Sequence, residues 1–534
     1  MYDILSNGYF QFFLVVAVYF IILFFLAGRK ILFNIPSEHI IVSEDEIDAD
    51  KLKEAFRSHP LNKDFDISRI SSKTWKISDA DNIYIMKKRE KNLSICSPSK
   101  LDKKNISFFG PFLMWRTKKG REIINHLAKI RKFWNLYADI SIVVVIISMI
   151  LMFLVLLWEA TLVPRIPPEN APTPQMILGI PGINPYIPLW YGIIGLAVAM
   201  IFHETAHGIL TRVAKLKILS LGLLMFIVPV GAFVEPDEEG VTNTTHKKRA
   251  RLFSVGPGTN IFLAFVFAMI FSWGFMSSVS VPEDGVVIFG IQKDYPAANA
   301  TIMPWTRIIE INGTHVSNDD DFSAVMAQTH PGQNITMKGY YKGEEKSFNV
   351  TLASIDKYTY YSTYYPEQNK DEYKNVGYIG VSVSNPQYLL NTMQGPVRNS
   401  HSGMELLGNL FTYGITLPMG GYIPFPNDFR SVFEVHGPMA TLGDSFWILA
   451  AVMYWIMWIN LMIGLTNSLP AVPLDGGYVF RDGLHVLMKK LTPRIKDESR
   501  DKIVSATGSF FAYAVLLLII WQFIGPRILW MFAG

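Results

Sequence analysis

Long uninterrupted runs of apolar residues limit what this chain can fold into more than any other feature. A helix that crosses a bilayer needs about 20 predominantly apolar residues. Half of the 534 residues are apolar and only 18% are charged, a balance that is unusual for a soluble protein. We therefore expect a polytopic α-helical membrane protein with about six transmembrane helices, over 9–28, 140–158, 188–210, 253–276, 446–466 and 503–524.

The first of these segments, 9–28, lacks a basic stretch before it and a small-residue cleavage site after it. Both features are typical of cleaved signal peptides, so we expect a retained membrane anchor instead.

A further apolar block, 219–234, is too short for a confident span and is interrupted by Pro229 and Gly231. Irregular backbone at membrane depth must be covered by protein or must line a wet cavity. We expect a re-entrant or β-hairpin element here, with an additional span as the alternative.

The distribution of charge predicts the orientation of the chain. The segment 30–132 carries 22 Lys/Arg against 14 Asp/Glu, whereas 275–444 carries 10 against 17. The loops 211–251 and 474–502 are also basic. Because cytosolic loops carry an excess of Lys and Arg, we place the basic segments in the cytosol and the acidic segment outside. The small net charge of +4 gives no indication of nucleic-acid binding.

The polar segments divide into regions of different composition. Residues 31–133 are expected to form a cytosolic accessory region with one amphipathic helix over 46–59 and one strand-like run over 73–86. The proline-rich stretch 159–187 cannot form a regular helix and is expected to be an external linker. No function can be assigned to the accessory region.

Residues 283–354 differ again, because short alternating apolar runs are separated by turn signals such as Asn312-Gly313. This pattern is typical of a small mixed β/α domain. The following stretch, 355–445, is expected to be an extracytoplasmic linker region.

The segment His203-Glu204-Thr205-Ala206-His207 is the clearest chemical motif. Histidines at positions i and i+4 lie on one face of a helix and can bind one zinc ion. The glutamate between them lies near the metal and is positioned to take a proton from a water molecule. Ionisable groups in an apolar span are costly and indicate a functional site, although a structural polar cluster is the alternative.

Two histidines leave a catalytic zinc site one protein ligand short. The single cysteine, Cys96, excludes a thiolate-built site, so the missing ligand must be nitrogen or oxygen. The best acidic candidate is Asp475, just after the span 446–466, at the same predicted depth near the cytosolic face as His203 and His207. Gly476 and Gly477 would allow the backbone a tight course beside it. Alternatively, Asp475 is an ordinary turn residue at a helix end.

Together these motifs resemble those of the site-2 protease family of intramembrane zinc metalloproteases. The chain matches HExxH at His203–His207, G-x-x-x-N at Gly256 and Asn260, and N-x-x-P-x-x-x-x-D-G from Asn467 to Gly476. The motifs lie on separate spans in the family's order, and the likeness covers about 188–276 and 446–485, which would form the protease core.

The resemblance implies that His203, His207 and Asp475 bind Zn²⁺ and that Glu204 is the general base. It also implies that Asn467 and Pro470 help to position the substrate. For Asn260, substrate contact and an interhelical hydrogen bond are equally good interpretations. The block 219–234 lies where the family has a membrane-associated β-hairpin, whose edge could accept an unwound substrate by β-addition.

The run 285–316 resembles a PDZ domain of the protease-associated kind. The matching parts are an apolar strand, the Tyr295-Pro296-Ala297 turn into a helix, and the I-x-x-I-N-G pattern over 308–313. The chain departs from the pattern at Trp305-Thr306, where such domains usually have Gly-Asp. The resemblance implies a module that binds a peptide or a chain end.

The fold class expected is thus a polytopic helical membrane protein with an inserted PDZ-like domain. The expected function is zinc-dependent cleavage of membrane-spanning protein substrates. The alternative is a non-catalytic membrane scaffold that binds client proteins through the PDZ-like domain.

Overall fold

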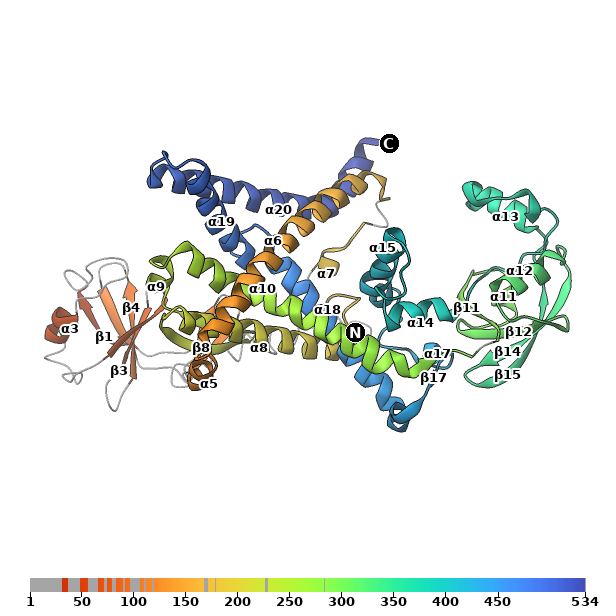
Figure 1. Ribbon diagram of the computed structural model, residues 1–534, viewed down its shortest axis with the longest axis horizontal. Coiled ribbons are helices and arrows are strands. Elements are labelled where there is room, and N and C mark those ends of the chain that lie inside the picture. Colours follow the sequence, from red (N-terminus) through yellow and green to blue (C-terminus); the bar gives the residue numbers. More distant parts are fainter. Residues whose placement is uncertain are drawn as a thin grey trace. The chain divides into compact units, whose positions relative to one another are not determined.

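The computed structural model describes residues 120–533 apart from 168–170, 178, 226–228 and 283 (Figure 1). Before residue 120 it describes only 31–36, 49–55, 66–71, 74–78, 83–89, 92–96, 106–109 and 112–117. The predicted first span, 9–28, therefore lies outside the described residues. The chain divides into two compact units, of which unit 1 takes in 1–142 and 200–256 and unit 2 takes in 143–199 and 257–534.

Five described helices are long and apolar enough to cross a bilayer, and they coincide with five of the six predicted spans. They are α6 (Arg131–Leu162), α8 (Leu189–Val213), α10 (His246–Met269), α18 (Asp444–Asn467) and α20 (Asp497–Ala533). The helical path of α10 continues through a π-helix, η3 (Ile270–Phe275), and a 3-10 turn, η4 (Met276–Ser278). The chain is a polytopic helical membrane protein, as predicted.

The block 219–234 forms a β-hairpin and not a further transmembrane helix. Its strands are β8 (Ile218–Met225) and β9 (Pro229–Pro236). They belong to a four-stranded antiparallel sheet with the order β6-β7-β8-β9, which includes β6 (Ile106–Phe109) and β7 (Phe112–Thr117). Gly222 permits this pairing, because a Cβ atom there would lie 2.2 Å from the backbone oxygen of Trp115. The hairpin thus shares its sheet with the predicted accessory region.

The accessory region also contains a five-stranded sheet with the order β1-β5-β4-β3-β2. The described residues of the strand-like run 73–86 belong to two antiparallel strands, β3 and β4, and those of the predicted helix 46–59 form α3. The element bounds are β1 (Ile31–Pro36), α3 (Ala49–Ala55), β2 (Asp66–Ser71), β3 (Thr74–Ser78), β4 (Ile83–Arg89) and β5 (Asn92–Cys96). Two short helices, α5 (Arg121–Leu127) and α9 (Glu238–Thr242), complete unit 1 beside the spans.

Unit 2 contains a sheet with the order β15-β14-β12-β11-β16, with β13 paired to β12. The strands are β11 (Val286–Ile291), β12 (Thr306–Ile311), β13 (Thr314–His315), β14 (Asn334–Tyr341), β15 (Glu344–Thr351) and β16 (Val381–Ser384). The helices α11 (Pro296–Asn299) and α12 (Asp319–Ala327) contribute Ala297 and Phe322 to its apolar core. Because β16 pairs with β11, the sheet continues beyond the predicted boundary at 354.

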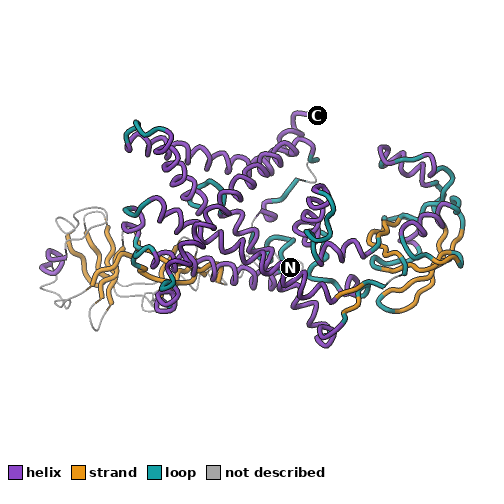
Figure 2. The backbone as a smooth tube through the Cα atoms, in the orientation of Figure 1, coloured by secondary structure: helices purple, strands orange, loops and turns teal. Residues whose placement is uncertain are grey.

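The stretch predicted as a linker, 355–445, is folded in the structure. Figure 2 shows it as short helices and strands joined by loops. Its elements are α13 (Lys357–Tyr364), η5 (Pro366–Gln368), η6 (Asp371–Tyr373), β16, α14 (Pro386–Gln394), α15 (Gly403–Phe411), η7 (Thr412–Thr416), α16 (Leu417–Met419), α17 (Asn427–Arg430), β17 (Glu434–Val435) and η8 (Gly437–Leu442). Aromatic side chains explain this order, since Phe425 and Phe429 are fully buried in one cluster with Trp447 of α18.

Candidate metal centre

Helix α8 presents His203, Glu204 and His207 near its C-terminal end. The two imidazoles lie one turn apart, with ring centroids 4.7 Å apart, and His203 is 5% exposed. Their Nε2 atoms face one another at 3.1 Å. The i, i+4 spacing therefore brings the two nitrogens together as the sequence predicted.

A backbone carbonyl fixes the tautomer of His207. Its Nδ1 lies 2.7 Å from the oxygen of Leu252 in α10. Because a carbonyl can only accept a hydrogen bond, Nδ1 carries a proton, and in the neutral imidazole Nε2 is then the nitrogen with the lone pair. Histidines that bind metals are commonly oriented in this way by a partner on their other nitrogen.

Gly256 allows α10 to approach the imidazoles closely. A Cβ atom at this position would lie 2.4 Å from Nε2 of His207 and 2.7 Å from both Nε2 and Cε1 of His203. Real Cβ atoms essentially never make such contacts, so any larger residue would have to displace the rings. The glycine of the G-x-x-x-N motif is thus a steric requirement of the histidine pair.

The carboxylate of Glu204 is held by strand β9. Its Oε2 accepts a hydrogen bond of 2.9 Å from the backbone N–H of Val234. This interaction joins the glutamate of the HExxH motif to the hairpin that the sequence placed near the site.

Asp475 is the first residue of α19 (Asp475–Leu491). The two glycines that follow it are needed for close packing, since a Cβ on Gly476 would lie 2.1 Å from the Ser468 oxygen and one on Gly477 would lie 2.5 Å from the Val472 nitrogen. The predicted tight course of the backbone beside Asp475 is therefore observed.

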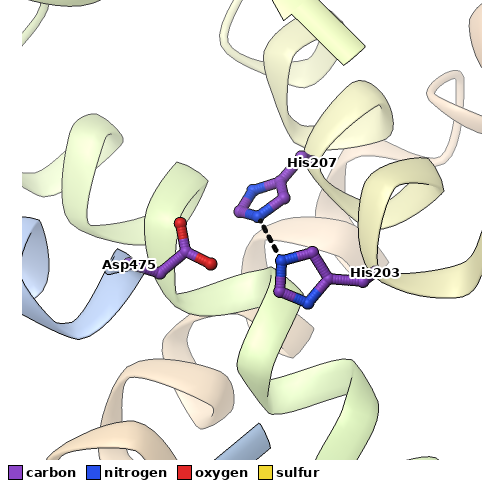
Figure 3. Close-up of side chains that lie close together, drawn as sticks. All are labelled: His203, His207 and Asp475. Atoms are coloured by element: carbon purple, nitrogen blue, oxygen red, sulfur yellow. Dashed lines mark hydrogen bonds between the residues drawn. The ribbon is translucent and has the colours of Figure 1, made fainter. Parts of the chain in front are cut away.

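The candidate ligand atoms of His203, His207 and Asp475 all lie within 4.8 Å of one another. Figure 3 shows the carboxylate of Asp475 directed toward the two imidazoles. Two nitrogens and one oxygen are a donor set that suits Zn²⁺. These three residues could therefore hold a metal ion.

Asn260 is fully buried in α10 and makes interhelical hydrogen bonds. Its Nδ2 donates to the backbone oxygen of Ala199 in α8, at 3.2 Å, and to Oδ1 of Asn460 in α18, at 3.0 Å. The geometry fits the interhelical interpretation. The predicted substrate-binding residues Asn467 and Pro470 lie at the end of α18 and in the loop before α19, where Asn467 is partly buried and Pro470 is buried.

Three groups around the histidines were not predicted from the sequence as parts of the site. They are the Leu252 carbonyl, the Val234 N–H and the close approach at Gly256. The first two are backbone groups and carry no side-chain signal. For Gly256 the sequence did contain an indication, because this residue belongs to the G-x-x-x-N motif.

Comparison with known proteins gives a consistent result. A family model described as peptidase family M50 matches residues 191–515, which is more than half of the chain. An uncharacterized protein of Methanocaldococcus jannaschii is 24% identical over 431 residues, 78% of this chain and 90% of the relative. The zinc metalloprotease Rip1 of Mycobacterium bovis is 22% identical, over 55% of this chain and 80% of the relative. The zinc metalloprotease RasP of Oceanobacillus iheyensis is 24% identical, over 52% and 59% respectively.

Proposed function

Since the chain belongs to peptidase family M50 and is a zinc-dependent metalloendopeptidase of the membrane, we propose that His203, His207 and Asp475 bind its zinc and that Glu204 is its general base. The observation that carries this proposal is the convergence of the three candidate ligand atoms within 4.8 Å, with Glu204 adjacent to His203 in α8.

When bound there, zinc supplies Lewis acidity toward the scissile carbonyl and lowers the pKa of a water molecule. The role of the chain is to hold the ligands in place. The Leu252 carbonyl holds the Nδ1 proton of His207 and so turns Nε2 toward the site, and Gly256 leaves room for both rings. Asp475 adds a negative charge that offsets part of the charge of the cation.

Glu204 takes a proton from the attacking water and delivers it to the leaving amine nitrogen. This task requires a carboxylate of fixed orientation close to the reacting atoms. The hydrogen bond from Val234 N–H to Oε2 supplies one restraint on that orientation.

We further propose that the substrate binds along strand β9. A helical substrate must unwind locally before its scissile carbonyl is accessible, and an open strand edge can accept the unwound segment. Among the described strands, β9 pairs only with β8. Because Val234 N–H is directed to Glu204, the unpaired side of β9 faces the proposed base.

The substrate class that follows is a membrane-spanning protein. His203, Glu204 and His207 lie within the apolar helix Leu189–Val213, which is long enough to cross a bilayer. From the charge distribution, we place the site near the cytosolic face and the sheet of β11–β16 outside.

For that sheet we propose a PDZ-like module that binds a peptide or a chain end. The departure from the usual Gly-Asp pattern at Trp305 is compatible with this fold, because Trp305 has φ 70°, a left-handed conformation that glycine adopts easily. Packing of the indole ring against Phe429, with centroids 4.8 Å apart, offsets the cost of that conformation.

The test is cleavage of a single-span reporter protein by the purified full-length enzyme in phospholipid vesicles. Glu204→Gln should abolish cleavage, whereas the same change at exposed Glu239 in α9 should leave it intact. Equal cleavage by wild type and Glu204→Gln would refute the proposed base. Binding of the reporter by wild type without any cleavage would favour the scaffold alternative.

A further inference from the structure

The segment 406–427 contains no charged residue, although it lies in the acidic region outside the predicted spans. It includes most of α15, the π-helix η7 and α16. The exposed face of α15 is apolar, with Met404, Leu407 and Phe411 exposed by 80%, 63% and 56%. The buried face instead contains Asn409, which accepts from Tyr388 and donates to Ser400. This inverted amphipathic pattern is opposite to that of a helix on a water-soluble surface.

Two hydrogen bonds place η7 at the depth of a transmembrane helix. The Tyr454 hydroxyl donates to the backbone oxygen of Tyr413, and Nε1 of Trp458 donates to the backbone oxygen of Gly414 at 2.8 Å. Both donors belong to α18, which begins at Asp444, whose side chain is 95% exposed. At 1.5 Å per residue, Tyr454 and Trp458 lie about 15 and about 21 Å along the helix from Asp444. These distances lie at the middle of a hydrocarbon core about 30 Å thick and somewhat beyond it.

The same hydrogen bonds satisfy backbone carbonyl groups that would lack a donor in the absence of water. Pro418 has no N–H to donate to the carbonyl four residues earlier, which is that of Gly414. The π-helical turn also interrupts the regular α-helical hydrogen bonding. In hydrocarbon an unsatisfied carbonyl costs several kcal/mol, so side-chain donors from neighbouring helices are required. Tyr454 and Trp458 are such donors.

From these observations we infer that residues 403–419 form a re-entrant element, which enters the bilayer from the side on which Asp444 lies and turns back at membrane depth. Its polar face packs on the protein. Its apolar face, formed by Met404, Leu407, Phe411 and Ile415, contacts the acyl chains of the lipid. The partner of this surface is therefore the hydrocarbon core of the bilayer. This inference rests on α18 crossing the membrane and is independent of the proposed catalytic residues.

Continuity with the spans favours lipid over a protein partner. Tyr413 also pairs with Ser272 of η3, with 3.2 Å between the hydroxyl oxygens. Leu417 is fully buried in the cluster that includes Phe271, Tyr454 and Trp455. The element thus packs between two membrane-crossing helices on one side, and its other side continues their lipid-facing surface. On α18 that surface is formed by residues such as Ile448 and Leu449.

Site-directed spin labelling of the full chain in phospholipid vesicles tests this inference. Nitroxides would be attached singly at Leu407→Cys and Phe411→Cys in a background that lacks Cys96. Collision with oxygen reports exposure to lipid, and collision with a water-soluble nickel chelate reports exposure to water. Ile448→Cys in α18 is the matched lipid-exposed control, and Glu367→Cys in the exposed turn after α13 is the matched aqueous control.

We expect both α15 labels to collide readily with oxygen and to collide with the nickel chelate several-fold less often than the label at 367. The label at 448 should behave in the same way. Nickel collision rates at 407 and 411 equal to that at 367 would place the helix in water and overturn the inference. Low collision rates with both reagents would show a face covered by protein, and would also overturn it.

Discussion

Two clusters of polar side chains lie within the apolar helices, one around Asn260 and one around His203 and His207. They differ in how hydrogen bonds orient their polar atoms. At Asn260 the amide bonds to Asn460 and to the Ala199 carbonyl, so the cluster joins three helices. At His203 and His207 two Nε2 atoms converge, and the Leu252 carbonyl orients the other ring nitrogen of His207. In this chain the polar cluster that belongs to the proposed site is the one whose partners orient its side chains toward a shared point.

The surrounding backbone supports the same distinction. Around the histidines, α10 contributes a glycine whose missing side chain makes room for the rings. Around Asn260 a glycine instead lets two helices pack on each other, since a Cβ at Gly464 of α18 would lie 2.7 Å from Cγ1 of Ile261 in α10. The first arrangement has the features of a binding site and the second those of a helix junction.

Apart from changes to the proposed zinc ligands and base, the largest effect is expected for Gly256→Ala, which inserts a methyl group against both imidazoles. A displacement of about 1 Å at a catalytic centre can reduce the rate by about 100-fold. We expect a loss of that order together with weakened zinc binding, measured by reporter cleavage and by metal analysis. Gly274→Ala on the same helical path is the control, because its Cβ would meet only Ile270 at 3.9 Å. Equal activity of the two variants would show that the close approach at Gly256 is unimportant.

A smaller effect is expected when the restraint on Glu204 is removed. Val234→Pro deletes the N–H that bonds to Oε2, while Val234→Ala retains it. A hydrogen bond to a charged group contributes about 1.5–3 kcal/mol, so the proline variant should lose about 10- to 100-fold in kcat. Its zinc content should remain unchanged. If the alanine variant loses as much activity as the proline variant, the side chain and not the N–H is responsible.

The helix junction should affect stability more than catalysis. Asn260→Ala and Asn460→Ala should each lower thermal stability, and a double-mutant cycle should give a coupling energy of about 0.6 kcal/mol and at most about 1.7 kcal/mol, the average and maximum for side-chain hydrogen bonds in membranes. Thermal unfolding in detergent measures this coupling. A raised KM for Asn260→Ala with unchanged stability would instead support substrate contact and would remove the contrast between the two clusters.

The smallest effect is expected for an ion pair that is partly exposed to water. Lys342 Nζ lies 2.7 Å from Oδ1 of Asp428, linking the β14–β15 turn to α17. The Lys342 hydrogen bond holds the pKa of Asp428 below its usual range. A lowered carboxylate pKa stabilises the fold above the unfolded value of about 3.9, and this contribution is lost as the pH falls through the folded pKa. Asp428→Asn should therefore lower the melting temperature slightly at pH 7 and by less at pH 3, and an equal decrease at both values would contradict this.

The sequence was most informative where one residue type is dictated by one physical requirement. Apolar length predicted five helices that the structure contains, and the spacing of His203 and His207 predicted their convergence. The sequence was less informative about the stretch 355–445, because its folded state depends on Phe425 and Phe429 packing against Trp447, a distant residue. Short helices such as α15 also fall below the length threshold for spans. Backbone partners such as Leu252 and Val234 cannot be predicted, since every residue type offers them.

The most direct test of the proposed centre is the zinc content of four purified proteins, namely wild type, His203→Ala, Asp475→Ala and Glu204→Gln. The roles proposed here predict about one zinc per chain in wild type and in Glu204→Gln, since a general base is not a ligand. They predict a substantial loss of zinc from His203→Ala and Asp475→Ala. Zinc retained at the wild-type level in either of the last two proteins, or lost from Glu204→Gln, would contradict the assignment.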